Sequence, residues 1–353
     1  MVLFDPHFIC FKRKKRDRVQ NRCLGASFIS VLISLVIGVA LITSVLQWHQ
    51  VLKQTVKLER KKRQHLEIGR SILEFLKNDL RSCGYQGCRT MDDNFPITRG
   101  FVDFMSPYHF FRSDRAVFGL NTNVTTCYGH LPGSICERLK AQSEVLIIYN
   151  IPVTYAKLKE NMKQPQDALY LKGSKTIQKG SVVLISDGFQ GDLFIANSVE
   201  GNKIDHQKTV QTNISDSFSK NYKQNAEIVE LQTVAYYLGM SKTKQQDKFQ
   251  YSLYRDDLFK RAVVIAEDVV DFQAEYGIFN PTQGMLYQKA NVIEAELWNQ
   301  VCAVRLKLKT KENQPWEYDV AIRNRPCSHL SAHFIGVHLN ANDPSGRAGA
   351  SSG

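Results

Sequence analysis

The stretch ASFISVLISLVIGVALITSVLQW, residues 26–48, decides the architecture of the N-terminal part of this chain. It contains 23 residues without a charged side chain and is rich in Ile, Leu and Val. As a helix, it is long enough to cross a hydrocarbon core of about 30 Å. The sequence therefore predicts a membrane-spanning segment over residues 26–48.

Basic residues flank this segment on both sides. The run Lys12–Arg16 precedes it, and the positive-inside rule places that run in the cytoplasm. Basic residues recur between Lys53 and Arg63, so charge alone orients the helix weakly. Three interpretations remain: a cleaved secretory signal, an uncleaved anchor, or a leader that is removed ahead of the helix. A cleaved signal is disfavoured, because the apolar run is too long and no small-x-small cleavage site follows it closely.

The helical pattern continues beyond the apolar run. Residues 47–80 contain no Pro and one Gly, Gly69. Apolar residues recur there at helical spacing and define one stripe, formed by Leu66, Ile72, Leu73, Phe75, Leu76 and Leu80. We expect one helix over residues 26–80, about 82 Å long at 1.5 Å per residue, whose second half packs on a domain. The alternative is a signal anchor followed by a coiled linker.

The rest of the chain, from residue 144 to 339, is predicted to be mainly strands. Four segments are rich in Val, Ile and Tyr and are bounded by turn or charged residues: Val145–Tyr149, Val182–Ile185, Ile228–Leu238 and Val301–Leu308. In the last of them, apolar residues at 304, 306 and 308 alternate with basic ones at 305, 307 and 309. This alternation is typical of a half-exposed antiparallel strand.

Three other segments have weaker patterns. We expect a short helix at Asp268–Gln273, because Val269, Val270 and Phe272 would cluster on one side. Residues 84–140 hold turn residues and aromatics without clear periodicity, and we interpret them as an irregular insertion between the helix and the sheet. The tail, residues 340–353, has little to bury and is predicted to be disordered.

Composition excludes some classes of protein and leaves one partner class open. Of 353 residues, 43% are hydrophobic and 23% charged, which excludes wholesale disorder and collagen-like repetition. The formal net charge is +12, and residues 1–25 supply part of it, with seven Lys/Arg against Asp5 and Asp17. Without them, 39 Lys/Arg face 32 Asp/Glu. This excess, with aromatic residues for stacking, is a basis for DNA binding, but the scattered basic residues favour a solvated surface.

No combination of residues predicts catalysis or a metal site. The chain lacks GxSxG, P-loop and strand-following GxGxxG patterns. His329, His333 and His338 include an i,i+4 pair, but the Glu of H-E-x-x-H is missing and the surrounding apolar residues favour a strand. The acidic cluster Glu267, Asp268, Asp271 and Glu275 surrounds an apolar face and is interpreted as its solvated side. We therefore predict no enzyme activity, no cofactor and no metal.

A resemblance to type IV prepilins begins at residues 21–33, which read Asn21-Arg22-Cys23-Leu24-Gly25-Ala26-Ser27-Phe28-Ile29-Ser30-Val31-Leu32-Ile33. In that family, a peptidase cuts after the Gly that ends a short basic leader and usually methylates the new N-terminus. The resemblance implies that Gly25 precedes the cut and that Ala26 is the mature N-terminus. Ala26 stands where Phe or Met is commonest. Ser30 stands at the fifth mature position, where nearly every pilin carries Glu, so assembly in the manner of a major subunit is not implied.

Later segments resemble the PilW-like minor pilins, in the order expected for that family. NDLRSCGYQGC at 78–88 resembles the family's segment that follows the helix, and GSVVLISD at 180–187 with GDLF at 191–194 resembles its central pair of strands. SLYR at 252–255 with IAEDVVDFQAEYG at 265–277 resembles its late signature. VCAVRLKL at 301–308 and IRNR at 322–325 resemble its two final strands. Gly188 stands where the family often has Cys. The resemblance covers the chain from Gly25 to Arg325.

The resemblance implies an α+β, pilin-like fold. A basic leader (1–25) precedes a long helix (26–80), which spans the membrane in its first half. Its second half packs on a periplasmic, mainly antiparallel and disulfide-stapled β-domain (81–339). The implied function is a non-enzymatic minor pilin of the inner membrane that primes pilus assembly and sits at or near the filament tip on the cell surface. Its implied partners are the prepilin peptidase, other minor pilins and the major pilin.

Two alternatives to this function remain. The first is a minor pseudopilin of a type II secretion system, which shares the N-terminal helix and its use as a membrane anchor before assembly. The second is a filament-borne subunit that binds DNA or mediates adhesion.

The eight cysteines divide at the implied cut. Cys10 and Cys23 would stay in the cytoplasm, whereas six would lie outside it: Cys83, Cys88, Cys127, Cys136, Cys302 and Cys327. An even number in an oxidising compartment suits three disulfides. Proximity favours Cys83–Cys88 and Cys127–Cys136, leaving Cys302–Cys327, although six cysteines allow fifteen pairings. The alternative is a zinc site from the first four, whose C-x4-C and C-x8-C spacings fit structural zinc motifs poorly.

Overall fold

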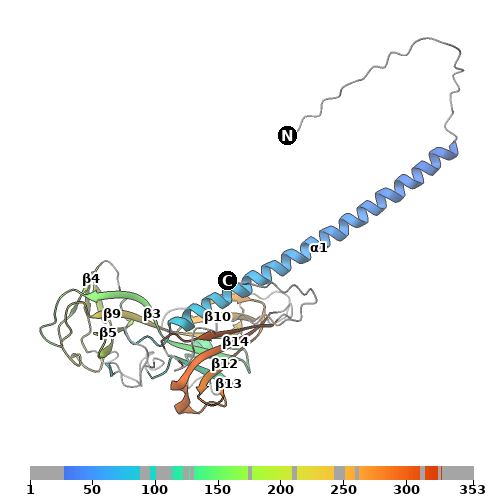
Figure 1. Cartoon of the computed structure of the whole chain (residues 1–353). Helices are drawn as coiled ribbons and strands as arrows, with labels where there is room; N and C mark the ends of the chain where they lie inside the picture. The colour runs from blue at the N-terminus through green and yellow to red at the C-terminus, as the bar shows by residue number, and fades with distance from the viewer. Residues whose placement is uncertain are drawn as a thin grey trace, which may run out of the picture. The chain divides into compact units, whose positions relative to one another are not determined.

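The chain divides into two units, Met1–His65 and Leu66–Gly353. The computed structural model describes residues 28–87, 96–100, 112, 114–121, 127, 131–173, 177–208, 213–241, 251–258, 262–310, 315–324 and 327. The first unit holds most of one long helix, and the second holds the end of that helix and the strands (Figure 1).

The long helix α1 runs from Phe28 to Ser82, which is 55 residues. The expected single helix is therefore confirmed, with both ends within two residues of the prediction. The helix stops because Gly84 adopts a φ of +67°, the left-handed conformation common just after a helix C-terminus. Asn324 donates from Nδ2 to the carbonyl oxygens of Ser82 (3.1 Å) and Cys83 (2.8 Å), so a distant residue satisfies the helix end.

Eleven strands form the larger sheet. Their hydrogen-bonded order is β1-β6-β5-β9-β3-β4-β8-β7, with β10 on β9, β11 on β10 and β2 on β3. The pairing of β1 with β6 is parallel, and the other strand pairs are antiparallel. The strands are β1 (Ile97–Arg99), β2 (Val117–Asn121), β3 (Glu144–Leu158), β4 (Leu169–Lys172), β5 (Val182–Ser186), β6 (Gly191–Ile195), β7 (Ser198–Glu200), β8 (Lys203–Asp205), β9 (Glu227–Met240), β10 (Tyr251–Asp257) and β11 (Ala262–Glu267).

Four strands form a second, fully antiparallel sheet in the order β13-β12-β14-β15. They are β12 (Val269–Asn280), β13 (Gly284–Lys289), β14 (Val301–Thr310) and β15 (Pro315–Ala321). Two short helical segments, α3 (Gly133–Cys136) and η2 (Ala295–Gln300), complete the described elements. The α+β class is thus established.

The end of α1 and the two sheets share one hydrophobic core. The helix contributes Ile72, Leu76 and Leu80, which lie on one face because they are four residues apart. They pack with residues of β3 and β9, such as Leu146 and Tyr236, and with residues of β12, β14 and β15. The expected apolar stripe is confirmed at Ile72, Leu73, Leu76 and Leu80 and wrong at Phe75, whose side chain is 55% exposed; the side chain of Leu66 lies outside the described part of the structure. Phe75 lies about 100° around the helix from Leu76, outside the buried arc.

The four expected strands are confirmed as β3, β5, β9 and β14, each somewhat longer than its apolar segment. Along β14, Val304, Leu306 and Leu308 are buried, whereas the basic residues between them are partly or fully exposed. The predicted half-exposed antiparallel strand is therefore correct at this position.

The helix expected at Asp268–Gln273 is wrong, because these residues belong to β12 and the turn before it. A register shift between Val269 and Asp271 inserts one extra residue opposite β14. Val269 and Phe272 are consequently buried on the same side three residues apart, a spacing that mimics a helix. Beyond the bulge, Phe272, Ala274 and Tyr276 return to the period of two.

The segment 84–140 is only partly irregular. Its described residues include β1 and β2, which join the larger sheet, and α3. The two strands have three and five residues, too few for the period of two to stand out in the sequence. The predicted tail, residues 340–353, lies outside the described residues.

Candidate functional site

The N-terminal part of α1 is apolar on all sides. From Ile29 to Leu46, every large apolar side chain is 47–65% exposed. A helix that packs on a protein core normally has one apolar stripe, whereas a helix that is apolar all round needs an apolar environment. The segment Ile29–Arg60, with mean hydropathy reaching 2.7, is long and apolar enough to cross a membrane, as expected of an anchor or a signal segment.

The hydroxyl groups within this segment are satisfied by the helix itself. Ser34 donates to the carbonyl of Val31, and Thr43 and Ser44 both donate to that of Ala40, at 2.8–2.9 Å. Polar groups in lipid require such internal partners, because no water is there to bind them. These side chains therefore carry little additional cost in an apolar environment.

The expected processing positions lie at the start of this helix. Ser30 is in its first turn and its side chain is exposed. Gly25 and Ala26 lie outside the described residues, so cleavage between them stays a prediction.

Within the second unit, the end of α1 is held to the larger sheet by a polar joint that we call the Asp79–Arg255 joint. Asp79 Oδ2 accepts hydrogen bonds from Arg255 Nε and from the Tyr236 hydroxyl, both at 2.7 Å. Arg255 also donates to Gln232 Oε1 at 3.2 Å. The side chains of Asp79 and Arg255 are only 16% and 22% exposed, so the ion pair is largely shielded from solvent.

Charge and burial act together in this joint. Burial lowers the pKa of Arg255, but the hydrogen bond and negative charge of Asp79 outweigh it and raise the pKa. Burial, reinforced by the Asp79 carboxylate, also raises the pKa of Tyr236. The guanidinium therefore stays charged and the phenol neutral, which keeps both as donors to Asp79.

The chain leaves α1 along the sheet. The amides of Gly84 and Tyr85 donate to the carbonyls of Tyr149 (2.9 Å) and Asn150 (3.1 Å) in β3. Gly87, with a φ of +96°, lies so close to Ser186 that a Cβ would meet its Oγ at 2.6 Å. Four of the segments on which the pilin resemblance rests therefore meet near the end of α1. They are residues 78–88, 180–187, 252–255 and 322–325.

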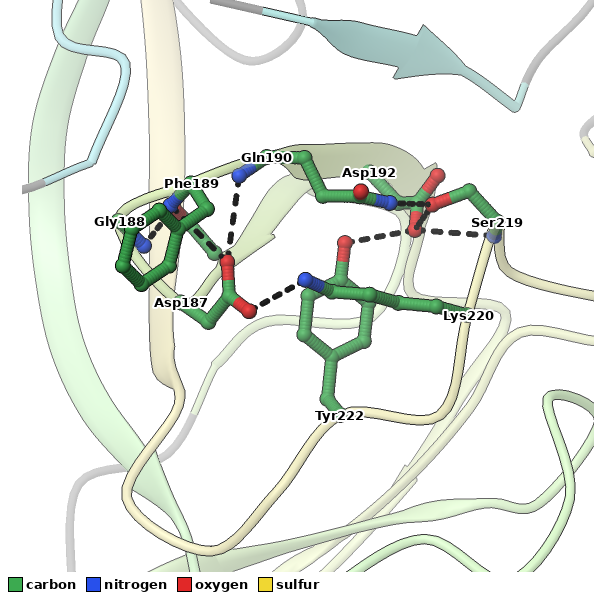
Figure 2. Close-up of polar contacts among 9 residues, drawn as sticks. Asp187, Gly188, Phe189, Gln190, Asp192, Ser219, Lys220 and Tyr222 are labelled. Atoms are coloured by element: carbon green, nitrogen blue, oxygen red, sulfur yellow. Dashed lines mark hydrogen bonds and ion pairs between the residues drawn. The ribbon is translucent and has the colours of Figure 1, made fainter.

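A second polar cluster braces the turn between β5 and β6 (Figure 2). Asp187 Oδ1 accepts hydrogen bonds from the amides of Phe189 (3.0 Å) and Gln190 (3.2 Å), and Oδ2 pairs with Lys220. Gln190 Nε2 donates to Ser219 Oγ at 2.7 Å. Burial alone would raise the pKa of Asp187, but the hydrogen bonds from Lys220, Phe189 and Gln190 lower it.

Asp192 anchors the same loop from β6. It is buried, and its Oδ2 accepts hydrogen bonds from Ser219 N (3.1 Å), Ser219 Oγ (2.7 Å) and the Tyr222 hydroxyl (2.7 Å). The polar side chains labelled in Figure 2 form hydrogen bonds or ion pairs with one another. The cluster thus has the geometry of a brace, and it presents Phe189 at the turn with 78% of its surface exposed.

Two of the three favoured disulfides are present. Cys127–Cys136 joins residues nine apart in sequence with a Cα–Cα distance of 5.7 Å, and Cys302–Cys327 joins residues 25 apart with a distance of 5.6 Å. Because Cys127 and Cys136 are bonded to each other, the zinc set of the first four cysteines is not available. Cys83 is buried, and its expected partner Cys88 lies outside the described residues.

Within the described ranges, no group of three or more His, Cys, Asp or Glu side chains is placed to hold a metal ion. The acidic cluster at 267–275 lies along β11 and β12, and one of its members, Glu275, pairs with Lys307 of β14 at 2.6 Å. His329, His333 and His338 lie outside the described residues.

The sequence did not reveal the Asp79–Arg255 joint, because its members are 176 residues apart and each resembles an ordinary surface charge. The available signal was indirect: both residues fall in segments that carry the pilin resemblance. The chain matches no protein-family model, and no curated protein or solved structure matches it significantly.

Proposed function

We propose that this chain is a membrane-anchored minor pilin that primes type IV pilus assembly at or near the filament tip and has no enzymatic activity. The observation that carries the proposal is the division of α1. One continuous helix is apolar on all sides over Ile29–Leu46 and amphipathic where it enters a mainly antiparallel, disulfide-bearing domain. A pilin requires both properties, because the first part of its helix lies in lipid before assembly and the second part packs on the β-domain.

The site of processing and the topology follow from this proposal. The leader is cut after Gly25, and the mature helix spans the inner membrane once, with the β-domain in the periplasm. The oxidising periplasm accounts for Cys127–Cys136 and Cys302–Cys327. Its partners are the prepilin peptidase, the other minor pilins and the major pilin.

Ser30 supports a place at the tip. In pilins generally, the Glu at this position pairs in the apolar filament core with the N-terminal amine of the subunit ahead. An acid at membrane depth costs about 2.5–3.5 kcal/mol on insertion scales, so this pairing favours docking behind another subunit. Ser30 carries no such charge, whereas the amine of Ala26 still receives the Glu of the next subunit. The chain can therefore lead a filament without needing a subunit in front of it.

The N-terminus of the protein extracted from membranes tests the processing step. Mass spectrometry should find a mature chain that begins at Ala26, because the peptidase cuts on the cytoplasmic face and leaves the helix in the bilayer. A chain that retains Cys23, or one that begins after Trp48, contradicts the proposal.

Gene deletion tests the role in assembly. Surface pili recovered by shearing should be strongly reduced in the deletion strain and restored by the wild-type gene, but not by a Gly25→Asp variant that blocks processing. Normal piliation with a loss of protein secretion would favour the type II pseudopilin instead. Gold labelling of sheared filaments should mark one end, and labelling along their whole length would contradict the tip position.

A further inference from the structure

The part of α1 that follows the most apolar stretch has two opposite faces. At about 100° per residue, Lys53, Lys57 and Arg60 fall within an arc of about 60°. Trp48, Val51 and Leu58 fall on the opposite side of the helix, within an arc of about 80°. These three apolar side chains are 58–68% exposed, and the three cations are exposed as well. Lys53, Lys57 and Arg60 therefore form a basic stripe on one side of residues 48–60, and Leu52 and Val56 lie between this stripe and the opposite side.

The cations of this segment are not used by the protein. In the described part of the chain, Lys53, Lys57 and Arg60 make no ion pair and no side-chain hydrogen bond. The sequence from 48 to 63 contains six Lys/Arg and a single acid, Glu59. By contrast, several cations around the end of α1 and on β14 are paired, as Arg255 is with Asp79 and Arg305 with Asp319.

The position of the segment identifies what covers it. Lys53 lies five residues, about 7.5 Å of helix, beyond Trp48, where a spanning helix reaches the lipid headgroups. Trp is favoured at that level, and Lys and Arg extend from it toward phosphates. A nucleic acid would satisfy the basic side chains but leave Trp48 in water. A lipid surface at the end of the span keeps Trp48 at the edge of the hydrocarbon and places phosphates within reach of the basic side chains.

We propose that the basic stripe of Lys53, Lys57 and Arg60, which begins where α1 leaves the membrane span, binds the headgroups of anionic phospholipids. The proposal rests on the membrane span that the proposed function also uses, but not on a role in pili. It gives a reason for basic residues on both sides of the span. The second basic group binds the leaflet on the side of the β-domain and so fixes the depth of the helix.

The test uses the full chain in lipid nanodiscs that contain equal amounts of phosphatidylglycerol and phosphatidylcholine. Bromine on the acyl chains of one lipid or the other quenches the fluorescence of Trp48 when that lipid lies beside it. A Trp48→Phe variant gives the background from Trp298 and Trp316. We expect bromine on phosphatidylglycerol to quench more strongly and to indicate an enrichment of about fivefold or more beside Trp48, the factor that about one cation near an anionic surface supplies.

Two matched variants separate this effect from general charge. Lys53→Gln/Lys57→Gln/Arg60→Gln should reduce the enrichment to about one. Arg70→Gln/Lys172→Gln/Lys179→Gln removes three exposed cations from the β-domain unit and should leave it unchanged. Equal quenching by both lipids in the wild type would overturn the headgroup proposal and leave the span intact, whereas absence of quenching by either lipid would overturn both. Salt-sensitive binding of duplex DNA that the first variant abolishes, without lipid enrichment, would assign the cations to nucleic acid and also overturn the proposal.

Discussion

The two parts of α1 have the same backbone conformation and opposite surroundings. From Ile29 to Leu46 the large apolar side chains are exposed in every direction, whereas Ile72, Leu76 and Leu80 are at most 1% exposed in the shared core. The difference lies in the distribution of apolar residues, which is continuous in the first part and restricted to one stripe in the second. Helix formation is therefore common to both parts, and the sequence specifies separately in each part whether it suits an apolar medium on all sides or a protein core on one side.

The largest effect is expected from placing acids in the first part. Ile37→Asp/Leu41→Asp should cost about 5–7 kcal/mol of membrane insertion, because each acid at the centre of a span costs about 2.5–3.5 kcal/mol. The fraction of protein that resists alkaline extraction from membranes should fall sharply. The control is Arg70→Asp/Phe75→Asp, since both positions are exposed in the second part. If both variants are extracted alike, the first part does not depend on lipid.

A smaller effect is expected from truncating one leucine in either part. Leu76→Ala should destabilise the β-domain by about 2–5 kcal/mol, because it leaves a cavity in the shared core. Leu41→Ala, whose side chain is 62% exposed, should change the unfolding of that domain by less than about 0.5 kcal/mol. Thermal unfolding of the full chain in nanodiscs, followed by near-UV circular dichroism, measures both. If both variants lower the melting temperature equally, the two parts of α1 contribute alike to the stability of the β-domain.

The two glycines of α1 give the most closely matched comparison. A Cβ on Gly69 would lie 2.8 Å from the Trp316 ring, whereas a Cβ on Gly38 meets nothing within 4 Å. Gly69→Ala should therefore cost about 1 kcal/mol, since the clash exceeds the gain in helix propensity. Gly38→Ala should not destabilise the domain.

A second-site variant checks the mechanism at Gly69. The Gly69→Ala/Trp316→Leu double variant should show a smaller loss than the sum of the two single losses, because Leu leaves room for the new methyl group. Strict additivity in the same melting experiment would show that Gly69→Ala acts in some other way.

Local patterns predicted much of this fold, because they are carried by neighbouring residues. The limits of α1 followed from the start of the apolar run, the absence of Pro and the apolar stripe that ends at Leu80, and β14 followed from its strict alternation. The pairing of Cys127 with Cys136 followed from their separation of nine residues. Each of these features is decided within one element or one short loop.

The features that the sequence did not predict depend on partners far away in the chain. The bulge in β12 shifts the pairing with β14, and this made Val269 and Phe272 resemble a helical face. Phe75 was assigned to the buried stripe, although the sheets cover a narrower arc of the helix. Asp79 meets Arg255 only because β10 pairs with β9 beside the helix end. The apolar part of the candidate site could therefore be predicted from the sequence, whereas the Asp79–Arg255 joint could not.

The smallest effect is expected at the end of α1, where Asn324 binds two carbonyl groups. Asn324→Ala removes the donor to Ser82 and Cys83 and should cost about 1 kcal/mol of domain stability. Asn324→Asp keeps the shape, but at neutral pH it cannot donate and brings a negative charge to a helix C-terminus, which costs about 0.3–1 kcal/mol more. The folded state would raise the pKa of this Asp, so the cost of its charge appears as the pH rises through the carboxyl pKa and is absent at lower pH, where the acid can donate to one of the two carbonyls. Melting temperatures between pH 3 and pH 7 test this prediction, and at pH 7 they should decrease in the order wild type, Asn324→Ala, Asn324→Asp. If the Asp variant is as stable as wild type at pH 7, the two hydrogen bonds of Asn324 do not stabilise the helix end.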